Sequence, residues 1–268
     1  MRNLRLIGAV LIALFTLVTY YCNRSTNPVT GEIQHVNMSA EQEIALGLQA
    51  APEMAQQYGG LSQNTEIANK VKQIGQKIVA QTAAGKSPYK FEFHLLADPN
   101  TVNAFALPGG QVFITEGILR QPKSEAELAG VLGHEIGHVV GRHSAEQVAK
   151  SQLTQGLSGA AAVGLYDPEH PSTAAAAAGA AMVAKLMTLR FGRQDELEAD
   201  RMAVRFTADA GYDPRAMVGV MQTLERVGGG GGGPEFTQTH PNPGNRIAEI
   251  ERAIQQEFPQ GVPSGLVQ

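Results

Sequence analysis

The pentapeptide from His134 to His138, with the sequence H-E-I-G-H, has residue types and a spacing that can bind a metal ion. On an α-helix, residues four apart lie about 40° from each other around the axis and one turn along it. Two imidazoles placed in this way can both reach one tetrahedral Zn²⁺ ion. Glu135 lies about 100° further round, where its carboxylate can hold a water molecule beside the metal. The pattern therefore indicates the chemistry of a zinc hydrolase.

The residues before the pentapeptide predict the helix that must carry it. Ser124 is a suitable N-cap, and Glu127, three residues on, completes a capping-box pattern. Apolar residues then recur at helical spacing at Leu128, Val131 and Leu132. A core helix with two packed histidines is the structural alternative, and this pattern alone does not exclude it.

Two groups of residues could supply a third zinc ligand. His143 nearly fits a metzincin pattern, but that pattern needs histidine at the next position, where Ser144 stands. If the helix continued, His143 would point about 180° away from His134, so we interpret it as structural. Glu196 and Asp200 are four apart and share a helix face. One carboxylate could bind zinc while the other accepts the free N–H of a ligating histidine. A solvated acidic patch at a helix N-terminus is the alternative.

Four ordered motifs resemble the HtpX and CAAX-prenyl-protease family of zinc metallopeptidases, over roughly residues 30–255. They are the H-E-I-G-H pentapeptide, Glu196-x-x-x-Asp200, His240-Pro241 followed by Arg246, and the segment 103–110. The segment 27–31, N-P-V-T-G, resembles the start of the mature part in the exported LoiP-type branch. The resemblance implies one zinc ion bound by His134, His138 and Glu196. It also implies that Glu135 is the general base and that Asp200 supports a ligand.

The resemblance and the residue patterns together predict an α+β, mostly helical, zincin-like metallopeptidase with a small sheet beside the H-E-I-G-H helix. Alternation predicts a strand over 91–96 and two strands over 105–115, interrupted at Pro108, Gly109 and Gly110. Helical periodicity predicts further helices over 40–58, 66–82, 152–165, 174–189, 216–227 and 245–257.

Composition is that of one globular domain, which we place at 23–268 with a tail over 259–268. Hydrophobic residues make up 43% of the 268 residues, and the net charge is −4 without a basic run. Nucleic acid is therefore excluded as a partner. Cys22 is the only cysteine, so no zinc ribbon or disulfide framework can form within the chain.

Residues 1–22 predict an export signal or a membrane anchor. Arg2 and Arg5 precede an apolar run over 6–18, and this charge asymmetry places the rest of the chain outside the cytoplasm. A cytosolic helix is disfavoured for the same reason. Cys22 could carry a lipid after cleavage, although Tyr20 and Tyr21 depart from the small residues that usually precede such a cysteine. Lipidation, an uncleaved anchor and plain secretion all remain open, and each predicts the cell envelope.

A glycine-rich segment, predicted as a flexible loop over 228–244, leads into His240. Resemblance places His240 near the zinc, as a fourth ligand that makes the enzyme latent or as a donor to the oxyanion; a plain linker is the alternative. Asn103, Ala104, Phe105 and Arg246 are the predicted substrate contacts. The edge strand would hold an extended or unfolded polypeptide by backbone pairing. The expected function is cleavage of misfolded or unassembled envelope proteins, and the rival is a non-catalytic assembly factor.

Overall fold

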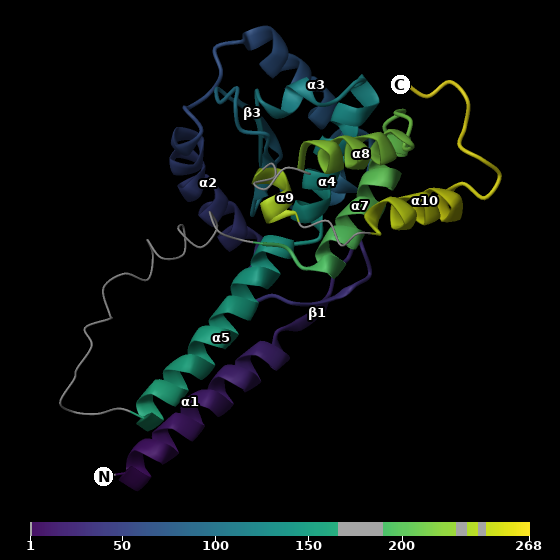
Figure 1. Cartoon of the computed structure of the whole chain (residues 1–268). Helices are drawn as coiled ribbons and strands as arrows, with labels where there is room; N and C mark the ends of the chain where they lie inside the picture. The colour runs from purple at the N-terminus through teal and green to yellow at the C-terminus, as the bar shows by residue number, and fades with distance from the viewer. Residues whose placement is uncertain (1, 166–189, 229–234, 241–244) are drawn as a thin grey trace.

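Helix α4 (Glu125–Val140) carries the H-E-I-G-H pentapeptide and lies at the centre of the molecule, with helices and a small sheet around it (Figure 1). The computed structural model describes residues 2–165, 190–228, 235–240 and 245–268. In these ranges the fold is α+β and mostly helical, as predicted. The other α-helices are α1 (Arg2–Cys22), α2 (Ala40–Gln57), α3 (Thr65–Gln81), α5 (His143–Leu165), α7 (Arg193–Asp209), α8 (Ala216–Gly228), α9 (Glu235–Thr239) and α10 (Arg246–Glu257). The strands and 3-10 helices are β1 (Arg24–Thr26), β2 (Ile33–His35), η1 (Ala83–Lys86), β3 (Glu92–Leu96), β4 (Ala104–Leu107), β5 (Gln111–Thr115) and η2 (Ile118–Arg120).

The start of α4 agrees with the sequence in part. The Ser124 side chain accepts a hydrogen bond from the Glu127 backbone N–H at 3.2 Å, which caps the helix as expected. The Glu127 carboxylate, however, accepts the N–H of Lys123 at 2.7 Å and not that of Ser124. Only half of the predicted capping box therefore forms, and the carboxylate satisfies the residue before the cap instead.

The larger sheet has the strand order β3-β5-β4, so β4 is an edge strand. Strand β3 runs parallel to β5, and β4 runs antiparallel to it. The β4–β5 turn passes through Gly109 and Gly110, whose φ angles of 83° and 109° strongly favour glycine. A Cβ on Gly109 would lie 2.4 Å from the backbone of Ile44, so the turn is also pressed against α2. The predicted small sheet thus lies beside α4, which contacts both β4 and β5.

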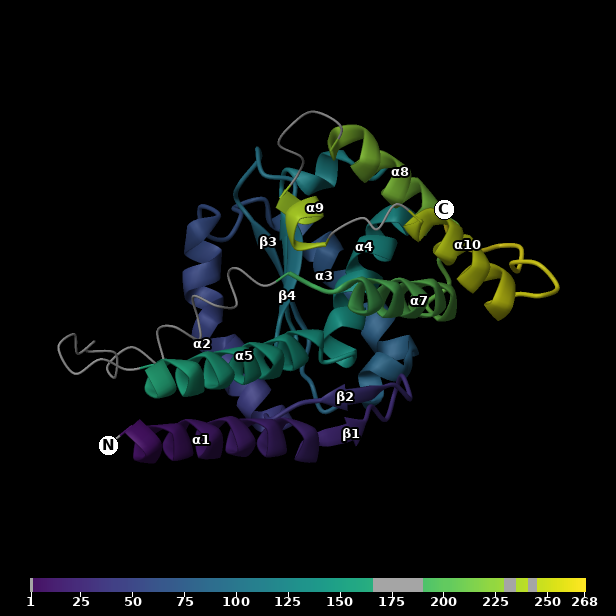
Figure 2. The same cartoon turned by 60° about the horizontal axis from the view of Figure 1, so that its bottom comes forward.

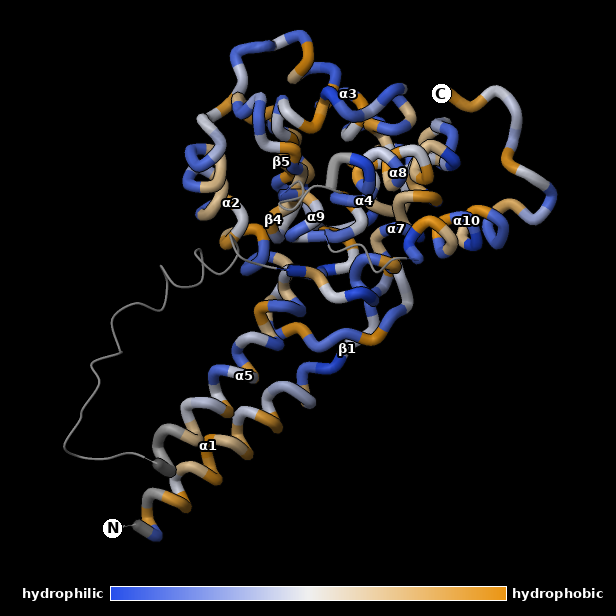
Figure 3. The backbone as a smooth tube through the Cα atoms, in the orientation of Figure 1, coloured by the Kyte–Doolittle hydropathy of each residue, from blue (hydrophilic) through white to orange (hydrophobic). Residues whose placement is uncertain are grey.

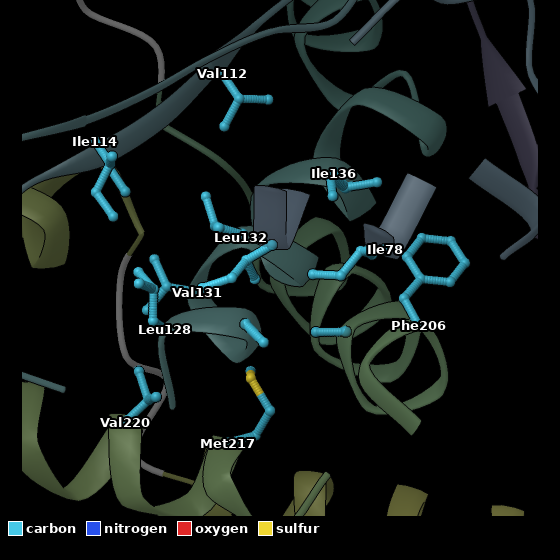
Figure 4. Close-up of a cluster of buried hydrophobic side chains, with 14 of the residues drawn as sticks. Ile78, Val112, Ile114, Leu128, Val131, Leu132, Ile136, Phe206, Met217 and Val220 are labelled. Atoms are coloured by element: carbon cyan, nitrogen blue, oxygen red, sulfur yellow. The ribbon is translucent and has the colours of Figure 1, made fainter. Parts of the chain in front are cut away.

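Apolar side chains from several helices and from the sheet fill the space around one side of α4 (Figure 4). Val112 and Ile114 of β5 belong to this core, whereas Phe113, between them, packs into a second cluster with α2. Strand β5 is therefore buried on both faces, which suits a central strand. The side chains labelled in Figure 4 come from α3, β5, α4, α7 and α8: Ile78, Val112, Ile114, Leu128, Val131, Leu132, Ile136, Phe206, Met217 and Val220.

Small residues let α7 approach α4 closely. Gly133 and Gly137 are four apart on α4, and they face Ala203 and Ala199 of α7. A Cβ on Gly137 would lie 3.1 Å from the Ala199 carbonyl oxygen and 3.2 Å from its Cα atom. On α4 the residues that follow these two glycines are the predicted ligands His134 and His138, and on α7 the predicted ligand Glu196 lies three residues before Ala199. The close approach therefore allows ligands from two helices to reach one ion.

We expect Gly137→Leu to lower the free energy of unfolding by about 1–3 kcal/mol, because a larger side chain must push α7 away from α4. The same displacement should weaken zinc binding. Urea unfolding monitored by circular dichroism measures the first effect. Gly159→Leu on α5 is the control, since a Cβ there would have nothing within 4 Å. Equal stability of the two variants would contradict the close packing.

Helices α1 and α5 lie side by side and extend away from the rest of the molecule (Figure 2). Helix α1 is apolar along much of its length (Figure 3). Many of its large side chains are exposed, among them Leu4, Ile7, Val10, Leu11, Leu14 and Phe15. Over the part of the chain that the structure describes, no helix combines the length and the apolar character needed to cross a bilayer. The use of residues 1–22 as signal or anchor, and a lipid on the exposed Cys22, stay predictions.

Three predicted segments differ from the structure or fall outside it. The helix predicted over 152–165 begins earlier, at His143, directly after the turn that follows α4. The segment 228–244, predicted as a flexible loop, contains the helix α9, because Glu235–Thr239 forms a helical turn against the sheet. The predicted helix over 174–189 and the residues 229–234 and 241–244 lie outside the described residues.

Candidate metal centre

Helices α4 and α7 bring the three predicted zinc ligands together, and the residue after α9 joins them. His134 and His138 come from α4, Glu196 from α7, and His240 follows α9 directly. Each of the four is 2% exposed or less. One ligand atom from each lies within 4.8 Å of the others.

The distances within this cluster fit a tetrahedral zinc ion. The Nε2 atoms of His134 and His138 are 3.0 Å apart, and His240 Nδ1 lies 3.3 Å from His134 Nε2. Glu196 Oε1 lies 3.1 Å from His240 Nδ1 and 3.6 Å from His138 Nε2. Ligand atoms about 2.0–2.1 Å from zinc at tetrahedral angles are separated by about 3.3 Å. Three ring nitrogens and a carboxylate oxygen at these spacings are a donor set that zinc prefers.

Glu135 lies beside the cluster in a fully buried position. Among the described residues, neither of its carboxylate oxygens has a hydrogen-bond partner, and Oε1 lies 3.6 Å from His240 Nε2. Burial raises the pKa of Glu135, and the nearby His240 and His134 only partly oppose this. A general base works best when its pKa is raised towards the working pH. The position and the environment of Glu135 therefore suit the predicted base.

Asp200 and Arg246 lie behind the ligands. Asp200 Oδ1 is 3.0 Å from His134 Nδ1, the ring nitrogen that faces away from the cluster. Arg246 donates two hydrogen bonds to Asp200, at 2.8 and 2.6 Å, and its Nη1 lies 2.9 Å from Glu196 Oε2. Burial raises the pKa of Asp200, but Arg246 and His134 together outweigh this effect and lower the pKa below its usual value. The arrangement fixes the orientation of two ligands at once.

This position does not suit the predicted role of Arg246 as a substrate contact. Its side chain is 1% exposed and its guanidinium is taken up by the two carboxylates. We infer instead that Arg246 holds Asp200 and Glu196 in place. Arg246 of the His-Pro and Arg motif thus supports the ligands and does not face the cleft. It reaches them because α10 begins at Arg246 and packs against α7.

The three predicted residues of the substrate strand lie at the edge of the sheet next to the cluster. Asn103 precedes β4, while Ala104 and Phe105 are its first residues. A cleft beside them is lined by Met54, Phe105, Leu107, Phe191, Glu235 and His240. All three strand residues have buried side chains, so the backbone is what this edge can offer an extended peptide.

Helix α9 is fastened to this edge. The Phe236 backbone N–H donates to the Val102 carbonyl at 3.2 Å, and the Glu235 carboxylate accepts from Asn103 at 3.2 Å and from the Tyr58 hydroxyl. On the other side, the Phe191 N–H donates to the Thr239 carbonyl at 3.2 Å. These contacts hold His240 in the metal cluster and place α9 against the residues that precede and begin β4.

Two contacts of His138 are missed by reasoning from the sequence. The ring of Phe191 stacks on that of His138, with centroids 3.9 Å apart. His143 does not point away, because α4 ends at Val140 and the chain turns; its Nδ1 lies 2.8 Å from His138 Nδ1. The glycine at 141 is the signal that could have indicated this turn.

Residues 66–254, well over half of the chain, match the model of peptidase family M48. The chain belongs to peptidase family M48. The mitochondrial metalloendopeptidase OMA1 of Schizosaccharomyces pombe is 32% identical over 237 residues, which cover 87% of this chain and 67% of the relative. OMA1 of Arabidopsis thaliana is 37% identical over 59% of this chain and 31% of its own length. The β-barrel assembly-enhancing protease of Escherichia coli K12 is 30% identical over 72% of this chain and 40% of its own.

Membership of M48 confirms the predicted family resemblance and the predicted enzyme class, a zinc metalloendopeptidase. It also confirms zinc as the cofactor. The aligned region spans about two thirds of the yeast relative and about a third of the plant one. The role of each site residue stays a prediction that substitutions can test.

Proposed function

We propose that this M48 protein is an endopeptidase of the cell envelope that cleaves misfolded or unassembled proteins, with Glu135 as the general base. The observation that carries this proposal is the buried Glu135 carboxylate, which has no hydrogen-bond partner among the described residues and lies beside four residues spaced for zinc. A purely structural zinc site would need no such carboxylate.

The zinc ion, when bound, supplies Lewis-acid polarisation and lowers the pKa of a water molecule. His134, His138 and Glu196 would hold it. Glu135 accepts the proton of the attacking water and later passes it to the leaving amine. Its raised pKa helps the first transfer, since a more basic carboxylate takes the proton of water more readily.

The edge strand β4 supports extended polypeptides as substrates. Pairing along a strand edge recognises backbone, so it accepts many sequences in unfolded segments and few in folded proteins. One relative is named for enhancing β-barrel assembly, which supports the envelope as the place of action. An uncleaved anchor over 1–22, or a lipid on Cys22, would keep the enzyme at the membrane.

A chaperone-like assembly factor without proteolysis is the second candidate. Helix α9 favours it, because this helix holds His240 in the metal cluster, where a fourth protein ligand would exclude the attacking water. A Glu135→Gln variant with an affinity tag tests both candidates in cells. An envelope endopeptidase predicts that envelope proteins accumulate on the variant and are cleaved by added wild-type enzyme. Proteins that bind both forms equally and remain intact would favour the assembly factor.

We expect His240→Ala to raise the basal cleavage of an unfolded substrate such as casein. His240 Nδ1 lies 3.3 Å from His134 Nε2 and 3.1 Å from Glu196 Oε1, which is the separation of two ligand atoms on one zinc ion. A zinc ion bound by four protein ligands cannot activate water. If the closed state is favoured by about 1.4 kcal/mol, its loss raises the rate about tenfold. Cleavage is followed by fluorescence of labelled casein, with zinc content measured in parallel.

Glu235→Ala is the companion variant, because it loosens α9 without touching the metal cluster. A closed state held by α9 predicts higher activity in this variant too. A fall in cleavage by His240→Ala with zinc retained would show that His240 instead assists the reaction as an oxyanion donor. Unchanged cleavage would make His240 part of a linker.

A further inference from the structure

The end of α4 is an elbow built by residues that the proposed reaction does not use. The chain leaves the helix through Arg142, whose φ of 59° is left-handed and unusual for a residue with a side chain. Asn27 donates to the Val140 carbonyl at 2.8 Å, and Gln34 donates to the Gly141 carbonyl at 2.6 Å. Arg142 itself is anchored on the buried Glu43. Four side chains outside the helix thus determine how α4 ends.

The elbow brings the next residue back against the metal cluster. The His143 ring lies over Gly141, where a Cβ would be 2.4 Å from His143 Nε2. His143 Nδ1 lies 2.8 Å from His138 Nδ1, and its Nε2 lies 3.3 Å from Glu198 Oε2. His143 is 1% exposed, so these two partners and not water satisfy its ring nitrogens. A row of three side chains therefore runs from Glu198 through His143 to His138.

Only one arrangement of protons lets this row serve zinc. The Nε2 atom of His138 faces the cluster, so it must present a lone pair and its proton must sit on Nδ1. That N–H needs an acceptor, so His143 Nδ1 must be unprotonated and its proton must sit on Nε2. The Nε2–H then needs an acceptor, which the Glu198 carboxylate provides. A proton on Nδ1 of both rings would place two N–H groups against each other, and reversing both rings would put the His138 proton on Nε2, where zinc must bind.

The N-P-V-T-G segment over 27–31 reaches both ends of this arrangement. Asn27 caps α4, and its side-chain oxygen also accepts the backbone N–H groups of Val29 and Thr30 at 2.9 and 3.1 Å. Thr30 of the same segment lies beside the Glu198 side chain. The segment thus holds the elbow and also reaches the carboxylate at the far end of the row.

We propose that Glu198 and His143 act as positioning residues, forming a hydrogen-bonded relay that locks His138 in its zinc-binding tautomer. The relay rests on the proposed zinc site but assigns to these two residues a role that the reaction itself does not need. Metal-ligating histidines depend on the partner of their second ring nitrogen, and loss of that partner typically costs about 10–100-fold in metal affinity. Here that partner is a second histidine, whose own state is set by a carboxylate one step further away.

The first test is the zinc affinity of the full chain, measured by competition with a fluorescent chelator. We expect Glu198→Ala and His143→Ala each to weaken zinc binding by about 10–100-fold while keeping one zinc per chain at saturation. The double variant should be no weaker than either single one, because both break the same relay. Glu198→Gln, which keeps an acceptor oxygen, should lie closer to the wild type. Asp209→Asn, at the exposed end of the same helix, is the control.

The second test reads the tautomer directly from the ring ¹⁵N shifts of the zinc-loaded wild type. We expect His143 to carry its proton on Nε2, which a merely structural histidine would not require. A proton on Nδ1 would overturn the relay even if the variants fail to fold. Unchanged zinc affinity in Glu198→Ala would also overturn it, while leaving the zinc site intact. A wild type that binds no zinc would overturn the zinc site and the relay together.

Discussion

Glu135→Gln should lower peptidase activity by about 10²–10⁴-fold, because the amide cannot accept the proton of the attacking water. Zinc content and stability should stay at wild-type levels. Both oxygens of Glu135 lack a hydrogen-bond partner among the described residues, so the substitution removes no hydrogen bond that the structure shows and alters only the 3.6 Å contact between Oε1 and His240 Nε2. The change tests the proton transfer with little disturbance of the surrounding structure.

The measurement is best made in the His240→Ala background as well as in the wild type. A closed site would keep the basal rate low and hide the effect of Glu135, whereas an open one exposes it. Turnover of a labelled peptide, thermal unfolding and bound zinc are followed together. Comparable turnover by the Glu135→Gln and parent enzymes in the open background would remove Glu135 from the mechanism.

Glu196→Ala is expected to weaken zinc binding by more than about 100-fold and to abolish activity, since it removes a ligand and not only its support. The free Arg246 guanidinium adds to the loss, because its Nη1 then keeps a buried charge without the partner 2.9 Å away. Metal analysis after dialysis measures the zinc that is retained, and chelator competition measures the zinc affinity. An alanine variant that keeps its zinc would exclude Glu196 as the third ligand.

Asp200→Asn separates direct from indirect contributions. It acts through the Nδ1 of His134, so we expect a loss of about 10–100-fold in affinity, similar to that of His143→Ala and smaller than that of Glu196→Ala. The reverse order, with His143→Ala metal-free and Glu196→Ala fully loaded, would contradict the ligand set implied by M48 membership.

The helix that carries the site could be predicted from the sequence because its signals are local. The cap at Ser124, the apolar stripe and the four-residue spacing of the histidines all fall within sixteen residues. The same spacing in Glu196-x-x-x-Asp200 indicated a pair of carboxylates on one helix face, and the family resemblance then implied that Glu196 is the ligand. The edge strand could be predicted for a similar reason, since Gly109 and Gly110 mark a turn between two segments predicted as strands.

Other features depend on contacts between distant segments, which no local pattern records. Helix α9 is five residues long and is held by Asn103, Tyr58 and the Val102 carbonyl, so its own residues carry little helical signal. Arg246 reads as an exposed basic residue until Asp200 and Glu196 are seen to surround it. The fold of His143 back onto His138 depends on side chains more than a hundred residues earlier, which cap α4.

The buried residues around the site also set a balance of charge. Glu135, Glu196 and Asp200 are three carboxylates in the interior, and among the described residues Arg246 is the guanidinium that lies with them there and pairs with the last two. When all are ionised, the interior carries two net negative charges, and a divalent cation brings that sum to zero. Separated charges are costly in a medium of low polarity, so the ion neutralises the site as well as ordering it. A monovalent cation would leave half of the excess in place, which favours occupation by a doubly charged metal.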